Sequence, residues 1–196
     1  MSTIIEDGPG TGKKLAINGR NEAKTFAVTE SESQAATLLG FSHSINTGDI
    51  ISLTAGDASI LYFKNDEDVD IVIEQVCVGI RGFTGLTDRA VVTIIRNPTA
   101  GDIISDATAV SMNQNRNFGS SKSLKSTTLI YKGKAAGTIT GGNDIIQRYL
   151  TDNTSFCELS NIELTRGSAI GIKIDSDATA GTCFAELVMH IVDIER

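Results

Sequence analysis

The side chains that could do chemistry are few and scattered along the 196 residues of this chain. The two histidines, His43 and His190, are separated by most of the sequence, and no Gly-x-Ser-x-Gly motif of a serine hydrolase is present. No Ser/His/Asp or Cys/His set has the arrangement that nucleophilic catalysis requires. The sequence therefore predicts a protein that is not an enzyme and uses no cofactor.

The glycine-rich segment Asp7–Lys14 is superficially like a phosphate-binding loop. Such a loop needs Gly, four residues, Gly, Lys, and then Ser or Thr as a magnesium ligand. Only three residues separate Gly8 from Gly12, and Lys14 stands where the hydroxyl residue belongs. We therefore interpret the segment as a flexible arm and not as a nucleotide site.

The run Asn65–Asp70 is the densest group of carboxylates in the chain. Carboxylate oxygens can bind calcium, but the EF-hand pattern with its central Gly and terminal Glu is missing. The run favours a charged turn between two strands, and calcium binding at Asp66–Asp70 stays open. It is also the one local candidate for the two close acidic residues that a sandwich hydrolase or lyase would need.

The three cysteines, Cys77, Cys157 and Cys183, stand in separate apolar runs. No Cys-x-x-Cys or Cys/His cluster exists, so the sequence predicts no metal site. We expect all three to be buried free thiols, as suits synthesis in a reducing cytosol.

The composition predicts the elements that surround these residues. The chain holds 24 Ile, 21 Thr and 10 Val, and β-branched side chains fit a pleated sheet better than a helix. Apolar-alternating runs recur about every 8–12 residues from Phe26 onward, a spacing typical of an all-β sandwich or barrel. We expect strands at Lys24–Thr29, Asp49–Thr54, Ser59–Lys64, Asp70–Ile80, Ala90–Arg96, Ala107–Met112, Ser126–Lys132, Ala136–Thr140, Ile145–Leu150, Phe156–Leu164, Ala169–Ile174 and Cys183–Val192.

The predicted fold is all-β: a jelly-roll-like antiparallel β-sandwich over residues 24–196, an extended N-terminal arm over 1–23, and at most one short helix. The helix is expected at Ser31–Leu39, where capping-box spacing precedes an apolar run and Gly40 follows. The apolar phase changes in Asp70–Ile80, which predicts a β-bulge near Glu74–Gln75.

Charge and hydropathy exclude several classes of protein. The formal net charge of −7 argues against a general nucleic-acid binder, which would have a basic face. The N-terminus lacks the charged and apolar regions of a signal peptide. No apolar run approaches the roughly 20 residues that span a bilayer. We expect neither secretion by the general route nor a membrane span.

The positive charge is concentrated in residues 107–143, which hold five Lys and Arg and no acidic residue. Within this region Ser111–Ser123 is predicted as a long polar loop, either a protein-contact site or a mobile solvated loop. Amide, Arg and aromatic side chains suit protein contacts. The candidate contact residues are Asn113, Asn115, Arg116, Phe118 and Lys122 in this loop, and Ile4, Ile5, Pro9, Leu15 and Ile17 in the arm.

Three segments, Asn21–Glu32, Ser44–Gly48 and Ile60–Asp68, resemble virion structural proteins of tailed bacteriophages. The glycine-rich Asp7–Gly12 and the later Asn117–Ser120 are similar in kind. The resemblance is close over residues 5–80 and looser beyond them. It implies a structural protein of the phage particle, on the capsid or the tail, and carries no catalytic residues.

From this resemblance we expect a capsid decoration or cement protein that binds the major capsid protein lattice, or other virion proteins, and stabilises the head. The alternative is a tail, baseplate or head-fibre component with a receptor-binding role. The expected assembly is a homo-oligomer, with a trimer favoured, located in the virion. No nucleic-acid or membrane partner is expected.

Overall fold

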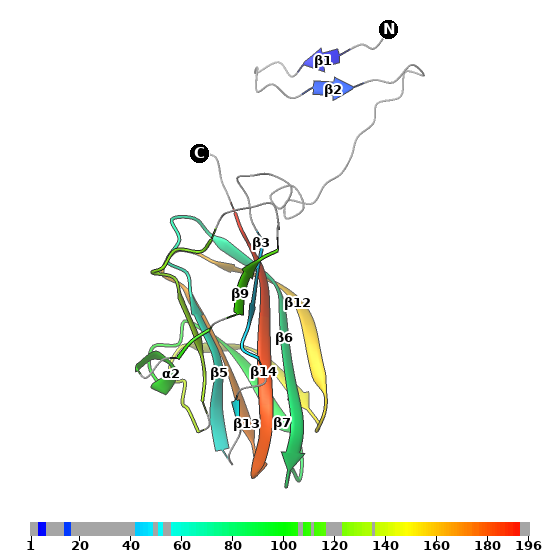
Figure 1. The fold of residues 1–196 in the computed structure, drawn as a ribbon, viewed down its shortest axis with the longest axis vertical. Coiled ribbons are helices and arrows are strands. Elements are labelled where there is room, and N and C mark those ends of the chain that lie inside the picture. The colour runs from blue at the N-terminus through cyan, green and yellow to red at the C-terminus, as the bar shows by residue number, and fades with distance from the viewer. Residues whose placement is uncertain are drawn as a thin grey trace.

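A computed structural model describes residues 4–6, 14–16, 42–48, 51–52, 56–105, 108–110, 112–116, 123–134 and 136–192. The described elements are almost all strands (Figure 1). They are β1 (Ile4–Glu6), β2 (Lys14–Ala16), β3 (Ser42–Asn46), β4 (Ile51–Ser52), β5 (Gly56–Lys64), β6 (Ile71–Thr84), β7 (Ala90–Arg96), α2 (Asp102–Ser105), β8 (Thr108–Ala109), β9 (Met112–Asn115), β10 (Leu129–Lys132), β11 (Asn143–Leu150), β12 (Ser155–Leu164), β13 (Ala169–Ser176) and β14 (Ala180–Ile191). Over these residues no helix has the length and apolar character needed to cross a bilayer.

Two antiparallel sheets form the sandwich. The first sheet has the order β11-β7-β13-β5-β10-β8, and the second has the order β12-β6-β14-β3-β9, with β4 also paired to β14. The eight main strands of the sandwich are β3, β5, β6, β7, β11, β12, β13 and β14. When they are numbered one to eight in chain order, their order is 6-3-8-1 in the second sheet and 5-4-7-2 in the first. Consecutive strands of this set cross between the sheets, except β7 and β11, which are neighbours in the first sheet. This is the double Greek key of a jelly roll, which confirms the predicted fold class.

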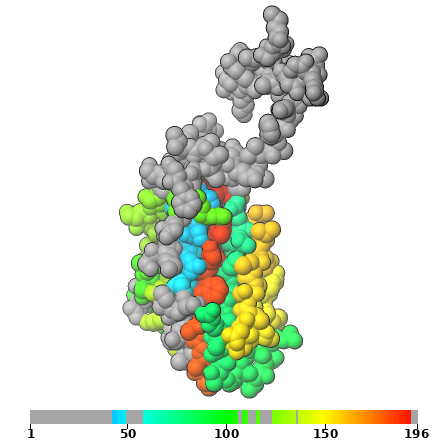
Figure 2. All heavy atoms as spheres, turned by 45° about the vertical axis from the view of Figure 1, so that its right-hand side comes forward, coloured from blue at the N-terminus to red at the C-terminus, as the bar shows by residue number. Residues whose placement is uncertain are grey.

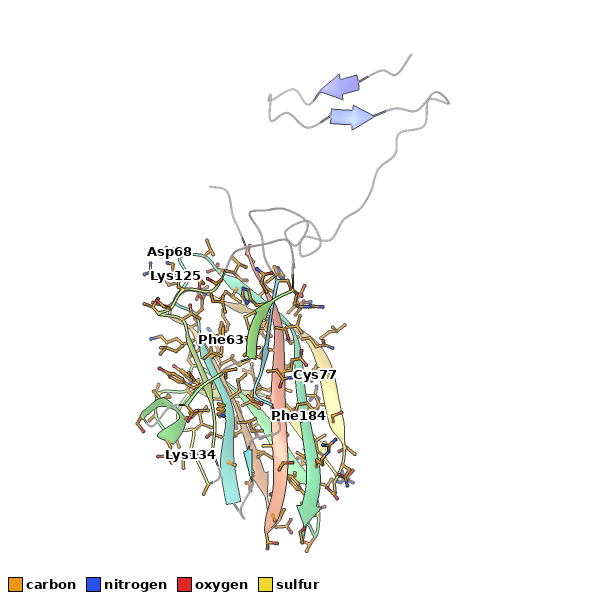
Figure 3. The ribbon with its side chains drawn as sticks, viewed as in Figure 1. Phe63, Asp68, Cys77, Lys125, Lys134 and Phe184 are labelled. Carbon is orange, nitrogen blue, oxygen red and sulfur yellow. A yellow bond between two sulfur atoms is a disulfide. The ribbon has the colours of Figure 1, made fainter. Side chains whose placement is uncertain are left out.

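The core lies between the sheets and follows from the period of two along each strand. In β13, Ile170, Ile172 and Ile174 all point inward and are buried, as their spacing predicts. Phe63 on β5, labelled in Figure 3, is among the largest fully buried side chains. Met189 and Ile191 on β14 belong to this core, whereas His190 between them does not.

A second, smaller cluster covers the opposite face of the first sheet. Tyr62 and Ile95 lie on that face and pack with Ile103 of α2 and with Ile139. Helix α2 was not predicted from the sequence, because four residues are too few to show a helical period.

Most expected strands are present with small changes at their ends. The expected strand Ala136–Thr140 is wrong: the structure has a single bridge between Thr140 and Ala100 there. Gly133 and Gly137 explain the difference, because each lies against Ser59, and Gly137 O accepts a hydrogen bond from Ser59 N. This segment therefore follows β5 as a closely packed loop.

Two further expectations need correction. The expected strand Ala107–Met112 is divided into β8 and β9. Strand β3 was not predicted, since Ser42–Asn46 has a single large apolar residue, Ile45, and is held by pairing with β14. The expected strand Lys24–Thr29 and helix Ser31–Leu39 lie outside the described residues.

The predicted β-bulge in β6 is confirmed. Val188 of β14 is opposite Gln75, and the next residue, Met189, is opposite Ile73, so Glu74 is the extra residue. The bulge keeps Ile73 and Val76 on the core face on both sides of the shift.

Strands β1 and β2 form a separate two-stranded antiparallel sheet within residues 1–23. Ile5 is opposite Leu15, and Ile4 is opposite Ala16. The division of the chain between an arm over 1–23 and a domain over 24–196 stays a prediction.

Candidate interaction surface

The predicted contact residues are distributed between two places in the described structure. Ile4 and Ile5 lie in β1 and Leu15 lies in β2. Asn113 and Asn115 lie in β9, and Arg116 directly follows it. The other four, Pro9, Ile17, Phe118 and Lys122, lie outside the described residues.

The long polar loop expected at Ser111–Ser123 is partly a strand, which corrects that prediction. Met112–Asn115 is β9, the edge strand of the second sheet next to β3. Asn113 is opposite Ile45 and Asn115 is opposite His43. The amide-rich sequence concealed the strand, because Asn is depleted in strands and here the pairing with β3 decides.

The acidic run Asn65–Asp70 is the turn between β5 and β6, as predicted. Asn65 is fully buried, and its amide donates hydrogen bonds to the carbonyl oxygens of Val69 and Leu164 at 3.1 and 2.8 Å. Glu67 accepts hydrogen bonds from Lys125 N at 2.6 Å and from Thr128 Oγ1 at 2.9 Å. These contacts tie the turn to the segment that precedes β10.

A second carboxylate of this turn, that of Asp68, forms surface ion pairs. Asp68 bonds to the Lys125 ammonium group (Figure 3) and lies 3.0 Å from Arg166 Nη1. The hydrogen bond and positive charge of Lys125 lower the pKa of the Asp68 carboxyl. Within the part of the chain that the structure describes, no three His, Cys, Asp or Glu side chains are grouped as metal ligands.

The buried titratable groups of the sandwich form isolated contacts. His190 Nδ1 lies 3.3 Å from Glu74 Oε1, and both side chains are largely buried on the outer side of β14 and β6. Cys183 is a buried free thiol, as predicted, and burial raises its pKa to about 12.

The expectation of three free thiols is wrong for Cys77 and Cys157, which form a disulfide. The two residues are directly opposite each other on β6 and β12, with a Cα–Cα distance of 4.1 Å. They are 80 residues apart in sequence, so only the pairing of these two strands brings them together. The disulfide links the outermost strand of the second sheet to its neighbour.

The two sides of the sandwich end in very different strands. On one side the edge strands are β8 and β9, with two and four residues. On the other side they are β11 and β12, with eight and ten residues. Figure 2 shows β12, in yellow, at the rim of the molecule beside β6, in green. A long edge strand presents a row of backbone groups that a further strand can pair with.

All three large apolar side chains that are exposed within the described residues lie on β11 and β12. They are Leu159, Tyr149 and Ile145, with exposed fractions of 80%, 61% and 42%. Single exposed apolar residues are ordinary on a protein surface, but the position of all three on two edge strands makes these strands the candidate interaction surface. We call β11 and β12 together the long edge.

One ion pair spans the long edge between the two sheets. Arg148 Nη2 on β11 donates to Glu158 Oε1 on β12 at 2.6 Å. Because these strands run in opposite directions, the contact also fixes which residues of the two strands lie at the same level.

A cavity of about 230 Å³ lies between the start of β11 and the end of β12. Ile145 of β11 and Ile162 and Leu164 of β12 line it, with Arg96 and Glu163 as its charged side chains. It has room for one partner side chain. The single acidic lining residue differs from the two close carboxylates that a hydrolase or lyase would place there.

The long edge was not predicted from the sequence as a site. Both strands were predicted, but not that they would be edges, since sheet order depends on the whole topology. One signal was present: Leu159 is out of phase with Phe156, Ile162 and Leu164, so it faces away from the core.

No protein-family model matches the sequence, and no curated protein matches it. Among solved structures, this chain is similar to a chain in the structure of infectious bursal disease virus Gx strain, with 14% identity and a TM-score of 0.36. The match covers 80% of this chain and 33% of the other, so this chain spans about a third of that chain's length.

Proposed function

We propose that this chain is a structural protein of a tailed-bacteriophage particle, and that it decorates or cements the capsid by binding the major capsid protein lattice. The observation that carries the proposal is the concentration of exposed apolar side chains on one long edge of a jelly-roll sandwich. Such a surface suits protein contact within an assembly of many copies, whereas fold alone does not select a function.

The arrangement of the titratable groups supports a structural role. The described carboxylates of the β5–β6 turn hold neighbouring loops together, and His190 pairs with Glu74 on the outer side of a sheet. A pocket in which a nucleophile, a base and an oxyanion donor converge is the arrangement expected of an enzyme. The mechanism that we propose is mechanical: each contact is modest, and many copies on one lattice act through effective concentration.

The proposal that the particle is that of a tailed bacteriophage rests on the sequence resemblance. The resembling segments include Ser44–Gly48, which covers most of β3, and Ile60–Asp68, which covers most of β5 and the acidic turn. These segments build the sandwich. The arm over residues 1–23 is the proposed fastening element, because a short two-stranded hairpin is marginal in water unless it packs on something else.

A binding experiment with particles that lack this chain tests the proposal. Purified full-length chain is expected to sediment with such particles and to raise the temperature at which their capsids rupture. Deletion of residues 1–20 is expected to abolish binding while the sandwich keeps its far-UV circular dichroism and melting temperature. No binding by the full-length chain would contradict the decoration role, and binding by the truncated chain would contradict the role of the arm.

A further inference from the structure

We propose that the long edge pairs with the long edge of a second copy of this chain across a two-fold axis. The two copies would join strand β12 to β12 and strand β11 to β11, each pair antiparallel. The axis would stand perpendicular to both sheets and pass through Leu159 and Gln147. This inference deepens the proposed function by assigning one self-association surface, and it can be tested in solution without any particle.

The levels of the two edge strands follow from the observed ion pair. Arg148 contacts Glu158, and the two strands run in opposite directions, so Gln147 lies at the level of Leu159. Leu159 is also at the middle of β12, four residues from its start at Ser155 and five from its end at Leu164. A two-fold axis at this level has similar lengths of β12 on both sides, with the β-bulge between Leu159 and Ile162 next to the axis.

This axis covers all three exposed large apolar side chains at once. Leu159 lies on the axis and faces Leu159 of the other copy. Along β11, Tyr149 lies two residues after Gln147, and Ile145 lies two residues before it at the β-bulge between Asp144 and Ile146, so both lie in the seam beside the axis. Ile145 is at the mouth of the 230 Å³ cavity, which has room for an aromatic ring. The large exposed apolar residues of the long edge thus all lie at the seam between the two symmetry copies.

The strand geometry agrees with this register. Residues directly opposite each other in an antiparallel pair point to the same face of the sheet. Leu159 and Cys157 face outward, and the axis places them opposite outward positions of the second copy. Phe156 and Ile162, which pack against the core, are likewise placed opposite each other. Each sheet then continues into the sheet of the other copy with its core face unbroken.

The charges at the long edge also permit the contact. The two strands and Arg96 carry two cationic and three acidic side chains, a net charge of −1, whereas the chain carries −7. In the proposed register Glu158 is opposite Ser160 and Glu163 is opposite Ser155, so no charged residue on β12 faces a like charge. Arg148 of β11 is opposite Ile146.

The lengths of the edge strands also favour an occupant on the long edge. Proteins protect edge strands by making them short, charged or bent, and the opposite side of this sandwich follows the first of these rules with β8 and β9. Strand β12 has a β-bulge between Leu159 and Ile162, but it keeps ten residues and an apolar centre. A closed two-fold pair covers both strands of the long edge and leaves neither of them free to pair with a further copy.

The symmetry makes a charge-swap experiment decisive. Size-exclusion chromatography with light scattering is expected to give twice the mass of the chain for wild type at micromolar concentration. Leu159→Lys and Leu159→Glu, each alone, are expected to give the mass of one chain, because two like charges meet at the axis. An equal mixture of the two variants is expected to restore the doubled mass, since only opposite charges then face each other.

Matched controls separate the proposed contact from loss of fold. Thr127→Lys adds a charge on the loop before β10, which lies near the opposite edge of the first sheet from β11. This variant is expected to keep the doubled mass. All variants are expected to melt within a few degrees of one another when diluted to monomer. Hydrogen exchange at residues 143–150 and 155–164 is expected to slow as wild-type concentration rises.

Three results would overturn the inference: a single-chain mass for wild type at every concentration, a doubled mass that survives in both Leu159 variants, or a mixture that fails to restore it. A three-chain mass would do the same, because a ring of three needs two different surfaces and not one self-complementary edge. None of these results would decide whether the chain binds particles, which has its own test.

Discussion

The disulfide between Cys77 and Cys157 is expected to supply a large part of the stability of the sandwich. It closes a loop with a sequence separation of 80 residues. In the loop-closure model, the lost entropy of the unfolded chain for a loop of that length corresponds to about 4.5 kcal/mol at 25 °C. A domain of this size commonly has a total of about 5–15 kcal/mol, so the loss would be conspicuous.

The assay is urea unfolding of wild type in the presence and absence of a reducing agent, next to the double variant Cys77→Ser/Cys157→Ser. Reduction is expected to lower the free energy of unfolding by about 2–4.5 kcal/mol and to leave wild type as stable as the double variant. Cys183→Ser is the matched control, because its thiol is free and buried, and its curve is expected to keep its dependence on the reducing agent.

A thiol count provides the refuting result. Denatured, unreduced protein is expected to contain one reactive thiol, that of Cys183, which reacts slowly in the folded state because burial raises its pKa to about 12. Three reactive thiols in protein purified under air would refute the disulfide. If protein with one reactive thiol has the same free energy of unfolding with and without the reducing agent, the loop-closure reasoning is refuted.

Three further predictions concern the loops. Gly133→Ala is expected to cost about 1–3 kcal/mol of unfolding free energy in urea melts, because the new methyl carbon would lie 1.7 Å from Ser59 O, and an unchanged melt would refute that packing. Asn65→Asp is expected to cost about 2–4 kcal/mol in the same assay, since two buried hydrogen bonds lose their donor, while a loss below about 1 kcal/mol would contradict their role. The Asp68 carboxyl, followed by NMR, is expected to titrate below the ordinary aspartate value, and Lys125→Met is expected to raise that midpoint. Because the folded-state pKa of Asp68 is lowered, its contribution to stability is present above the unfolded pKa and is lost as the pH falls through the folded one.

The fold class was predictable because it rests on local signals. Ile170, Ile172 and Ile174 alternate as a half-buried strand must, and the flip of phase at Glu74–Gln75 indicated the bulge that the structure contains. These features depend on neighbouring residues alone. A period of two survives any arrangement of the strands in the sheets, so it identifies strands without placing them.

The long edge and the disulfide could not be predicted for the same reason. Cys77 and Cys157 become neighbours only when β12 pairs with β6, and Leu159 is exposed because, among the described strands, none follows β12 in its sheet. Strand β3 was missed because its pairing with β14, and not its composition, makes it a strand. Which strands pair with each other depends on the topology of the whole sheet, and the composition of a single segment says little about it.

The most direct test of the proposed virion role is quantitative mass spectrometry of purified particles of the virus that encodes this chain. The account predicts that the chain copurifies with the particle in hundreds of copies, in a constant ratio to the major capsid protein, as a decoration of the capsid lattice requires. A few to a few dozen copies would move it to the tail, baseplate or vertex fibres. Its absence from purified particles would contradict the virion role itself.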